Sequence, residues 1–435
     1  MDEVHRVAGR RSITRPGFWQ LSATLCSTLI VASTYPVIVH ILDPRSFGIY
    51  MLVQWMANVS LPILGIGTAT LASRRVVEIL SREGVRQVAG IFFYLWYRQC
   101  WNILLYCGIY VALAILFARI YDAHTALLLL LAALAAAPHL LCSIAGIILR
   151  SRRRFKLLTI LRLFSSIILL LLIIIASHIN GDQTAILLLA STLAATLTLV
   201  LAVSCAVRIL PMGNIIYPGF YKQRYILKSL RGSFLLFTLD FIIWQQGELL
   251  LLALWRNPVE VGFYALSATI SAATMRIAPA IFSYCILPFY LRSHPGKRYV
   301  NTYDAFIKTS CAIVFLAIPI CIMMMVASPF AITALLGSAY LPLVKPLRIL
   351  LIATAFGSTA TISLTHLSNE GCKREQEYFA AGVALSKIVL AMPLIGLWGM
   401  TGAALVSATA QIISATGSIL FCYYLLSRRT NTVAA

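Results

Sequence analysis

Long apolar stretches recur along the whole chain and are separated by short polar gaps. Each stretch has about 20 residues or more, the length that a helix rising roughly 1.5 Å per residue needs to cross a hydrocarbon core of about 30 Å. The pattern predicts an all-α integral membrane protein with twelve transmembrane helices. We expect these spans at about residues 17–40, 47–71, 99–118, 125–149, 157–177, 184–207, 232–254, 261–291, 309–335, 343–367, 378–396 and 400–426.

Composition excludes a soluble fold. Hydrophobic residues make up 60% of the 435 positions, and a soluble domain of this size has too little interior to bury so much apolar surface. The membrane assignment therefore does not depend on any single span boundary.

Basic residues alternate along the gaps. Of the 35 Lys and Arg residues, 28 lie at the two termini and in or beside the even-numbered gaps. Because cytoplasmic loops of membrane proteins carry an excess of Lys and Arg, both termini are predicted to be cytoplasmic. The formal net charge of +21 then reflects cations that anchor helices and contact anionic membrane lipids, and nucleic acid is not an expected partner.

A short segment of the first half returns in the second half. Residues 42–52 and 256–266 share Asx, Pro, Gly, Tyr and Leu at a constant offset of 214 residues. Both copies link the first and second spans of a six-span half, so the halves are predicted to be parallel repeats related by an axis along the membrane normal. Chance similarity between two Asx-Pro turns remains the alternative. The repeated turn residues are Pro44, Gly48 and Tyr50, and Pro258, Gly262 and Tyr264.

The repeat divides the chain into two lobes. Residues 1–208 form the predicted N-terminal lobe with spans one to six, and residues 232–435 form the C-terminal lobe with spans seven to twelve. Between them, residues 209–231 carry Pro and Gly followed by a basic, aromatic run, which indicates a cytoplasmic interlobe linker at the membrane surface.

Signals of catalysis and of cofactor binding are lacking in the sequence. The chain has only six Asp and eight Glu, its seven His are isolated, and its ten Cys include no Cys-x-x-Cys pair. Metal and phosphate-binding motifs need such residues at fixed spacing. We therefore expect no catalytic residue, no metal and no cofactor, and the predicted outer gaps are too short for a catalytic domain. Transport is the function class that this pattern favours.

Several short motifs resemble one family of membrane proteins. The segment Leu42-Asp43-Pro44-x-x-Phe47-Gly48-x-Tyr50-x-Leu52 resembles the loop after the first span of bacterial polysaccharide-repeat flippases, which belong to a superfamily that also contains multidrug extruders and the lipid II flippase. Further similar segments are spread over almost the whole chain in the family's order, and each is degenerate by itself. They are Gly65-Ile66-Gly67 leading to Arg74, residues 261–266, Leu335-Leu336-Gly337-x-x-Tyr340-x-Pro342 with Leu347-Arg348, and Gly399-x-x-Gly402-Ala403-Ala404.

This resemblance implies a fold and a function. It implies two six-helix lobes that form a V around a central cavity and open alternately to each side of the bacterial cytoplasmic (inner) membrane. The implied cargo is a polyprenyl-pyrophosphate-linked oligosaccharide of O-antigen or exopolysaccharide synthesis, moved from the inner to the outer leaflet, with polysaccharide polymerase machinery as a further partner. The family has few fixed cavity residues, so the resemblance assigns no binding site.

Charged residues inside the predicted spans supply the candidate site. Charges are costly in hydrocarbon and usually pair or line a wet cavity. By depth, Asp240, Arg276 and Lys387 lie at comparable levels, whereas Glu248 lies in the outer half near Lys345 and Arg348 at the start of the tenth span. Asp240, Trp244 and Glu248 recur four residues apart, which places them on one helical face. The candidate residues are Arg276, Lys387, Lys345 and Arg348 for pyrophosphate, and Asp240 and Glu248 for a coupling ion.

Two interpretations of these charges stay open. In the first, they are closed ion pairs that hold the second lobe together; in the second, Arg276 and Lys387 form a basic surface that receives the pyrophosphate, and the acids carry H⁺ or Na⁺. Three functions are weighed accordingly: a flippase driven by an ion gradient, a small-molecule cation antiporter of the same superfamily, and a membrane glycan polymerase or acyltransferase.

Overall fold

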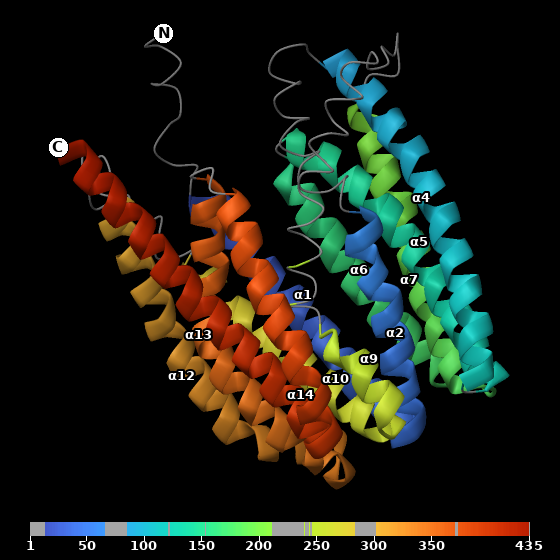
Figure 1. Cartoon of the computed structure of the whole chain (residues 1–435). Helices are drawn as coiled ribbons and strands as arrows, with labels where there is room; N and C mark the ends of the chain where they lie inside the picture. Colours follow the sequence, from blue (N-terminus) through green and yellow to red (C-terminus); the bar gives the residue numbers. More distant parts are fainter. Residues whose placement is uncertain are drawn as a thin grey trace. The chain divides into compact units, whose positions relative to one another are not determined.

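The computed structural model describes residues 14–65, 85–120, 122–152, 154–210, 239, 243, 246–282, 302–369 and 373–434. These residues are almost entirely helical (Figure 1). In the first half the helices are α1 (Thr14–Ile41), α2 (Pro44–Gly65), α4 (Val85–Ile120), α5 (Ala123–Ser151), α6 (Phe155–Ala176) and α7 (Gln183–Ile209). In the second half they are α9 (Glu248–Trp255), α10 (Pro258–Ile281), α12 (Thr302–Leu336), the short 3₁₀ helix η2 (Ser338–Leu343), α13 (Val344–Asn369) and α14 (Lys373–Ala434).

The protein is a multi-pass membrane protein. Seven helical segments within the described ranges are long and apolar enough to cross a bilayer. One of them, Glu375–Cys422, has 48 residues, or about 70 Å of helix at roughly 1.5 Å per residue, which is more than twice a hydrocarbon core. It contains the non-helical residue Gly399, which lies between the eleventh and twelfth predicted spans.

The chain divides into two compact units. One comprises residues 26–238, and the other comprises residues 239–435 together with residues 1–25. The start of α1 therefore groups with the second unit, whereas residues 1–208 were predicted to form the N-terminal lobe. The predicted linker, residues 209–231, falls almost entirely outside the described residues.

Helix α5 is at the centre of the first unit, where it packs against α2, α4, α6 and α7. Both α5 and α7 bury several alanines, and Ala145 of α5 clusters with Ala202 and Ala206 of α7; small side chains of this kind allow two helix backbones to approach closely in a membrane. Long side chains of α5 such as Leu127 and Leu134 point outward, as expected for a surface that faces lipid. The buried alanines are Ala132, Ala133, Ala136 and Ala145 of α5, and Ala194, Ala195, Ala202 and Ala206 of α7.

Helix α13 has the corresponding position in the second unit, between α10, α12 and α14. Buried hydroxyl groups join α10 to α13 and to η2: Ser271 Oγ and Thr354 Oγ1 lie 2.6 Å apart, and Ser267 donates to the carbonyl of Leu343, the last residue of η2, at 3.1 Å. Small polar side chains of this kind let helices pack closely and hydrogen-bond without exposing a polar group to lipid.

Two glycines allow α14 to reverse at its kink. Gly399 has φ 54° and ψ −129°, and an added Cβ there would lie 2.4 Å from Glu260 Oε2. At Gly402 an added Cβ would lie 1.9 Å from the carbonyl oxygen of Leu394. A side chain at Gly402 therefore meets rigid backbone, not a movable side chain.

We expect Gly402→Ala to prevent normal folding of the second unit, because the backbone of α14 would have to separate at the kink. Overpacking of this kind costs about 3 kcal/mol or more when backbone has to move. The matched control is Gly382→Ala on the same helix, where nothing lies within 4 Å of the added Cβ. Thermal unfolding in detergent should show a large loss of stability for Gly402→Ala alone, and equal melting temperatures for the two variants would contradict the assignment.

Candidate functional site

The seventh predicted span is interrupted near its middle. Ile243 is helical, Gln246 and Gly247 form a turn, and α9 begins at Glu248. Gln246 has φ 59°, a left-handed conformation that few residues other than glycine adopt. Because the helical hydrogen-bond pattern is broken at this turn, the carbonyl group of Ile243 is open to a donor from another helix.

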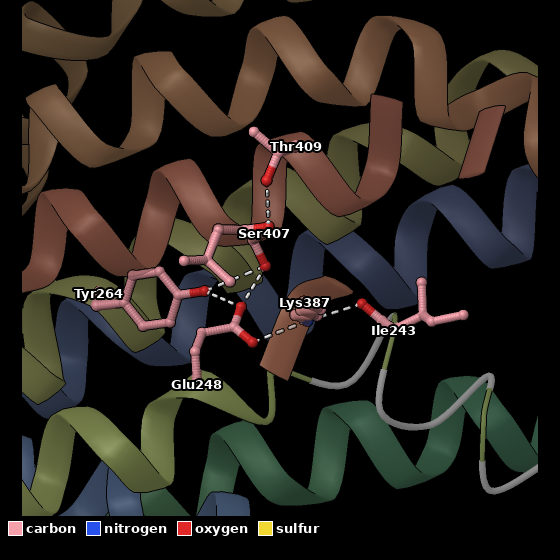
Figure 2. Close-up of polar contacts among 7 residues, drawn as sticks. Ile243, Glu248, Tyr264, Lys387, Ser407 and Thr409 are labelled. Atoms are coloured by element: carbon pink, nitrogen blue, oxygen red, sulfur yellow. Dashed lines mark hydrogen bonds and ion pairs between the residues drawn. The ribbon is translucent and has the colours of Figure 1, made fainter. Parts of the chain in front are cut away.

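Glu248 is at the centre of a buried polar network (Figure 2). Its Oε1 accepts hydrogen bonds from the hydroxyl groups of Tyr264 and Ser407. Its Oε2 lies 2.8 Å from the Nζ atom of Lys387, and the same ammonium donates to the Ile243 carbonyl oxygen at 2.8 Å. The carboxylate is thus paired with one cation and bonded to two hydroxyl groups.

Three helices contribute to this network. Glu248 is the first residue of α9, Tyr264 belongs to α10, and Lys387 and Ser407 belong to the parts of α14 before and after Gly399 (Figure 2). The side chains of Glu248 and Lys387 are 0% and 3% exposed, and Tyr264 is fully buried. The network therefore joins the interrupted seventh span to both parts of α14 inside one unit.

The electrostatics of the pair suit a membrane interior. An isolated charge in hydrocarbon is costly, and pairing with an opposite charge and with hydroxyl groups reduces this cost. Glu248 lies in the first turn of α9, where the helix dipole favours a negative charge. Lys387 binds a backbone carbonyl, the partially negative group that a cation favours. On one side of the interruption the negative charge of Glu248 thus lies at a helix N-terminus, and on the other side the positive charge of Lys387 lies at a carbonyl oxygen.

The structure gives Glu248 a different partner from the one that sequence depth suggested. Lys345 and Arg348 were expected near it, but its ion pair is formed with Lys387. Counting a fixed rise per residue locates a side chain only in a continuous, upright helix, and this span is interrupted before Glu248. For Glu248 and Lys387 the geometry corresponds to the closed ion pair, the first of the two interpretations. Asp240 lies outside the described residues.

The remaining candidate cations are exposed. Arg276 on α10 and Lys345 and Arg348 on α13 have exposed side chains and pair with no carboxylate within the described ranges. Arg348 Nε donates to the Met325 carbonyl at 3.4 Å. This carbonyl lies one turn before Pro329, which lacks the N–H that would normally bind it. The same carbonyl also accepts from the Ser328 hydroxyl group at 2.9 Å, so Arg348 is a second donor to a carbonyl that the proline leaves without its usual partner.

Both copies of the repeated turn start a helix in the same way. Pro44 begins α2 and Pro258 begins α10, and each follows an Asx residue that caps the helix. Hydrogen bonds from Ser46 and from backbone amides lower the pKa of Asp43 below its ordinary value. The local structure of the turn is therefore repeated. The equivalent residues are also buried in both copies: Gly48 and Gly262, and Tyr50 and Tyr264.

Two charged residues beside the second turn hold the kink of α14. Arg256 donates to the Gly396 carbonyl at 2.6 Å, and Glu260 Oε2 accepts from the Met400 N–H at 3.1 Å. The sequence alone indicated neither this role nor Ser407 and Tyr264 as partners of Glu248. The available signal was a pair of opposite charges flanking the repeated Pro258 turn.

The arrangement of the described residues offers binding and charge pairing. No group of three or more His, Cys, Asp or Glu side chains that could hold a metal ion occurs within the described part of the chain. The features described above are a buried ion pair at a helix interruption and exposed cations on membrane helices.

Residues 37–345 decide the family, because this range, well over half of the chain, matches the family model described as polysaccharide biosynthesis protein. The chain belongs to the polysaccharide biosynthesis protein family. The matched range of this family member contains both repeated turns, Glu248 and Tyr264, and it ends before Lys387 and Ser407.

Solved structures of related transporters share the fold of this family member. It is similar to the lipid II flippase MurJ in an inward closed conformation, with TM-score 0.68 and 13% identity over 92% of this chain and 86% of that one. It is also similar to an inward-facing multidrug resistance MATE family transporter of the MOP superfamily, with TM-score 0.66 and 12% identity over 96% of this chain and 99% of that one.

A MOP superfamily transporter from Pyrococcus furiosus is also similar, with TM-score 0.51 and 14% identity over 95% of this chain and 94% of that one. At such low identity these likenesses establish the fold alone. No curated protein sequence is similar enough to this chain to count as a match.

Proposed function

We propose that this protein is a flippase that moves a polyprenyl-pyrophosphate-linked oligosaccharide repeat unit from the cytoplasmic to the outer leaflet of the bacterial cytoplasmic membrane. The observation that carries the proposal is membership of the polysaccharide biosynthesis protein family by a chain that is a multi-pass membrane protein. A lipid-linked glycan made in the cytoplasm has to cross the membrane before it joins a polymer outside, and a membrane protein of this family without a catalytic signature suits that step.

The proposed architecture follows the fold of the similar transporters. Twelve spans form two six-helix lobes in a V, both termini are cytoplasmic, and the cargo crosses by alternating access between the lobes. The repeated Asx-Pro turns at Pro44 and Pro258 support equivalent positions in the two lobes. Polysaccharide polymerase machinery receives the cargo on the outer side.

Exposed cations within the membrane helices are proposed to receive the pyrophosphate. Arg276, Lys345 and Arg348 have exposed side chains, and guanidinium groups bind phosphate oxygens through strong charge-assisted hydrogen bonds. Lys387 is engaged by Glu248 and Ile243, so it binds pyrophosphate only in a state in which that network has opened.

An ion gradient is the proposed source of energy. Glu248 is a deep carboxylate with a cation bound to it, and Asp240 is the second acid of the same predicted span. Coupling requires such a group to gain and lose an ion as access alternates. Collapsing the proton gradient and the sodium gradient separately, in vesicles that contain labelled cargo, measures which of them drives movement.

Deletion of the gene in its native host should cause lipid-linked repeat units to accumulate on the cytoplasmic side of the membrane. The measurement is the labelling of these glycans by an impermeant reagent in inside-out and right-side-out vesicles, with the wild-type gene supplied in trans as the control. Repeat units that accumulate unpolymerised on the outer side would instead identify a polymerase, and unchanged lipid-linked glycans would reject the flippase.

A small-molecule cation antiporter is the second candidate. The similarity to a MATE family transporter, which covers 96% of this chain, and the deep carboxylate of Glu248 favour it. In this case the deletion would lower resistance to organic cations and leave lipid-linked glycans unchanged, so the same strains separate the two functions.

A further inference from the structure

The interruption of the seventh span has the composition of a cation site. Oxygen atoms of a carboxylate and of a backbone carbonyl meet there, Glu248 Oε2 and Ile243 O, and each lies 2.8 Å from the same nitrogen. Two hydroxyl groups, those of Tyr264 and Ser407, bind the other carboxylate oxygen. Oxygen donors of this kind suit hard cations, and carbonyl groups at interrupted membrane helices commonly bind monovalent cations.

The occupant of this position belongs to the chain itself. The Lys387 side chain is 3% exposed, and it reaches across from α14 to place its ammonium between the two oxygens (Figure 2). The negative charge of Glu248 is therefore compensated without an external ion. Lys387 is separated from Ile243 by 144 positions in the sequence. Tertiary packing, not local chain geometry, therefore places the ammonium group at this carbonyl.

We propose that the interruption of the seventh span is a monovalent-cation site and that the ammonium of Lys387 is the tethered cation that fills it. Removal of the side chain beyond Cβ would leave the oxygens of Glu248 and Ile243 around a vacated space. A sodium ion with water, or a small alkylammonium ion, would then bind in place of Lys387. In the native chain the site takes neither.

A consequence for coupling rests on the proposed function. If an ion gradient drives transport, this site excludes sodium as the ion bound at Glu248, because Lys387 already compensates the carboxylate. Proton transfer between the ammonium and the carboxylate is then the ion chemistry left to this site. The nitrogen loses the proton that the carboxylate oxygen gains, the carboxyl group releases it to water on one side of the membrane, and the amine takes up a proton from water on the other side to restore the pair.

The test measures cation binding without any transport assay. Purified full-length wild type, Lys387→Ala and the double variant Lys387→Ala/Glu248→Gln are melted in NaCl, in ethylammonium chloride and in choline chloride at equal ionic strength. Lys387→Ala should gain about 2–4 °C in sodium or ethylammonium over choline when the cation is about tenfold above its Kd. Wild type and the double variant should show no difference between the salts.

Three results would overturn the proposal. A sodium-dependent gain in wild type equal to that of Lys387→Ala would mean that Lys387 does not occupy the site. An equal gain in the double variant would mean that the cation does not bind at Glu248. Rescue by ethylammonium without any rescue by sodium would restrict the site to hydrogen-bonding ammonium groups and reject a general monovalent-cation site.

A second measurement tests the proposal if Lys387→Ala is too unstable to purify. Carbodiimide modifies membrane carboxyl groups, so Glu248 in Lys387→Ala can be labelled in native membranes, and sodium should reduce that labelling severalfold while choline should not. Labelling that is independent of sodium would contradict the proposal. Failure of the flippase test would leave these cation measurements unaffected, so the two proposals fail separately.

Discussion

Glu248→Gln and Lys387→Met, introduced one at a time, should each lower the free energy of unfolding by about 3–5 kcal/mol, because each removes one member of a buried ion pair and leaves the charge of the other member in a low-dielectric interior. The ion pair is 2.8 Å long and its two side chains are 0% and 3% exposed, so neither water nor lipid headgroups can compensate the remaining charge. Chemical or thermal unfolding in detergent measures the loss.

The double variant Glu248→Gln/Lys387→Met should recover most of that stability, because a neutral pair carries no uncompensated charge. Matched controls are Glu375→Gln on α14 and Lys156→Met on α6, whose side chains are exposed and whose changes should stay within about 0.5 kcal/mol. Additive losses in the double variant would show that the two residues stabilise the second unit independently of each other.

Arg276→Ala should reduce polysaccharide export at least tenfold while the protein remains in the membrane at a normal level. Loss of one charge-assisted hydrogen bond costs about 1.5–3 kcal/mol, and about 1.4 kcal/mol corresponds to a factor of ten. The physical reason is that the side chain is an exposed guanidinium on a membrane helix, where a pyrophosphate group would be its partner.

Export is measured as surface polysaccharide at matched protein level, with Arg162→Ala, which removes another exposed arginine of a membrane helix, α6, as the control. Arg276→Lys keeps the charge and should retain part of the activity, since a lysine binds phosphate as a point charge and lacks the guanidinium fork. Wild-type export by Arg276→Ala would remove this residue from the proposed pyrophosphate site.

Local features of the fold could be read from the sequence. The membrane assignment rests on the hydropathy of each stretch, and a stretch of about 20 apolar residues carries that information by itself. The Asx-Pro pairs at residues 43 and 257 do begin helices α2 and α10, because capping and the fixed φ of proline act within one turn. The relation between the two lobes stays a prediction.

Only part of the candidate site could be predicted from the sequence. Glu248 and Lys387 were each recognised as costly charges within spans, since that cost depends on the residue and its depth. Their pairing was not foreseen, nor were the hydroxyl partners Tyr264 and Ser407. Depth was counted along unbroken helices, whereas the seventh span is interrupted at Gln246 and α14 is kinked at Gly399.

The sequence by itself determined that the chain crosses a membrane as helices and where several of those helices begin, and it identified Glu248 and Lys387 as ionisable residues of apolar segments. These properties arise from short segments, because burial in lipid and helix capping depend on residues close together in the chain. Only the tertiary structure decided that Lys387 neutralises Glu248 and binds Ile243. That choice depends on packing between α9, α10 and α14, which brings together side chains more than a hundred residues apart.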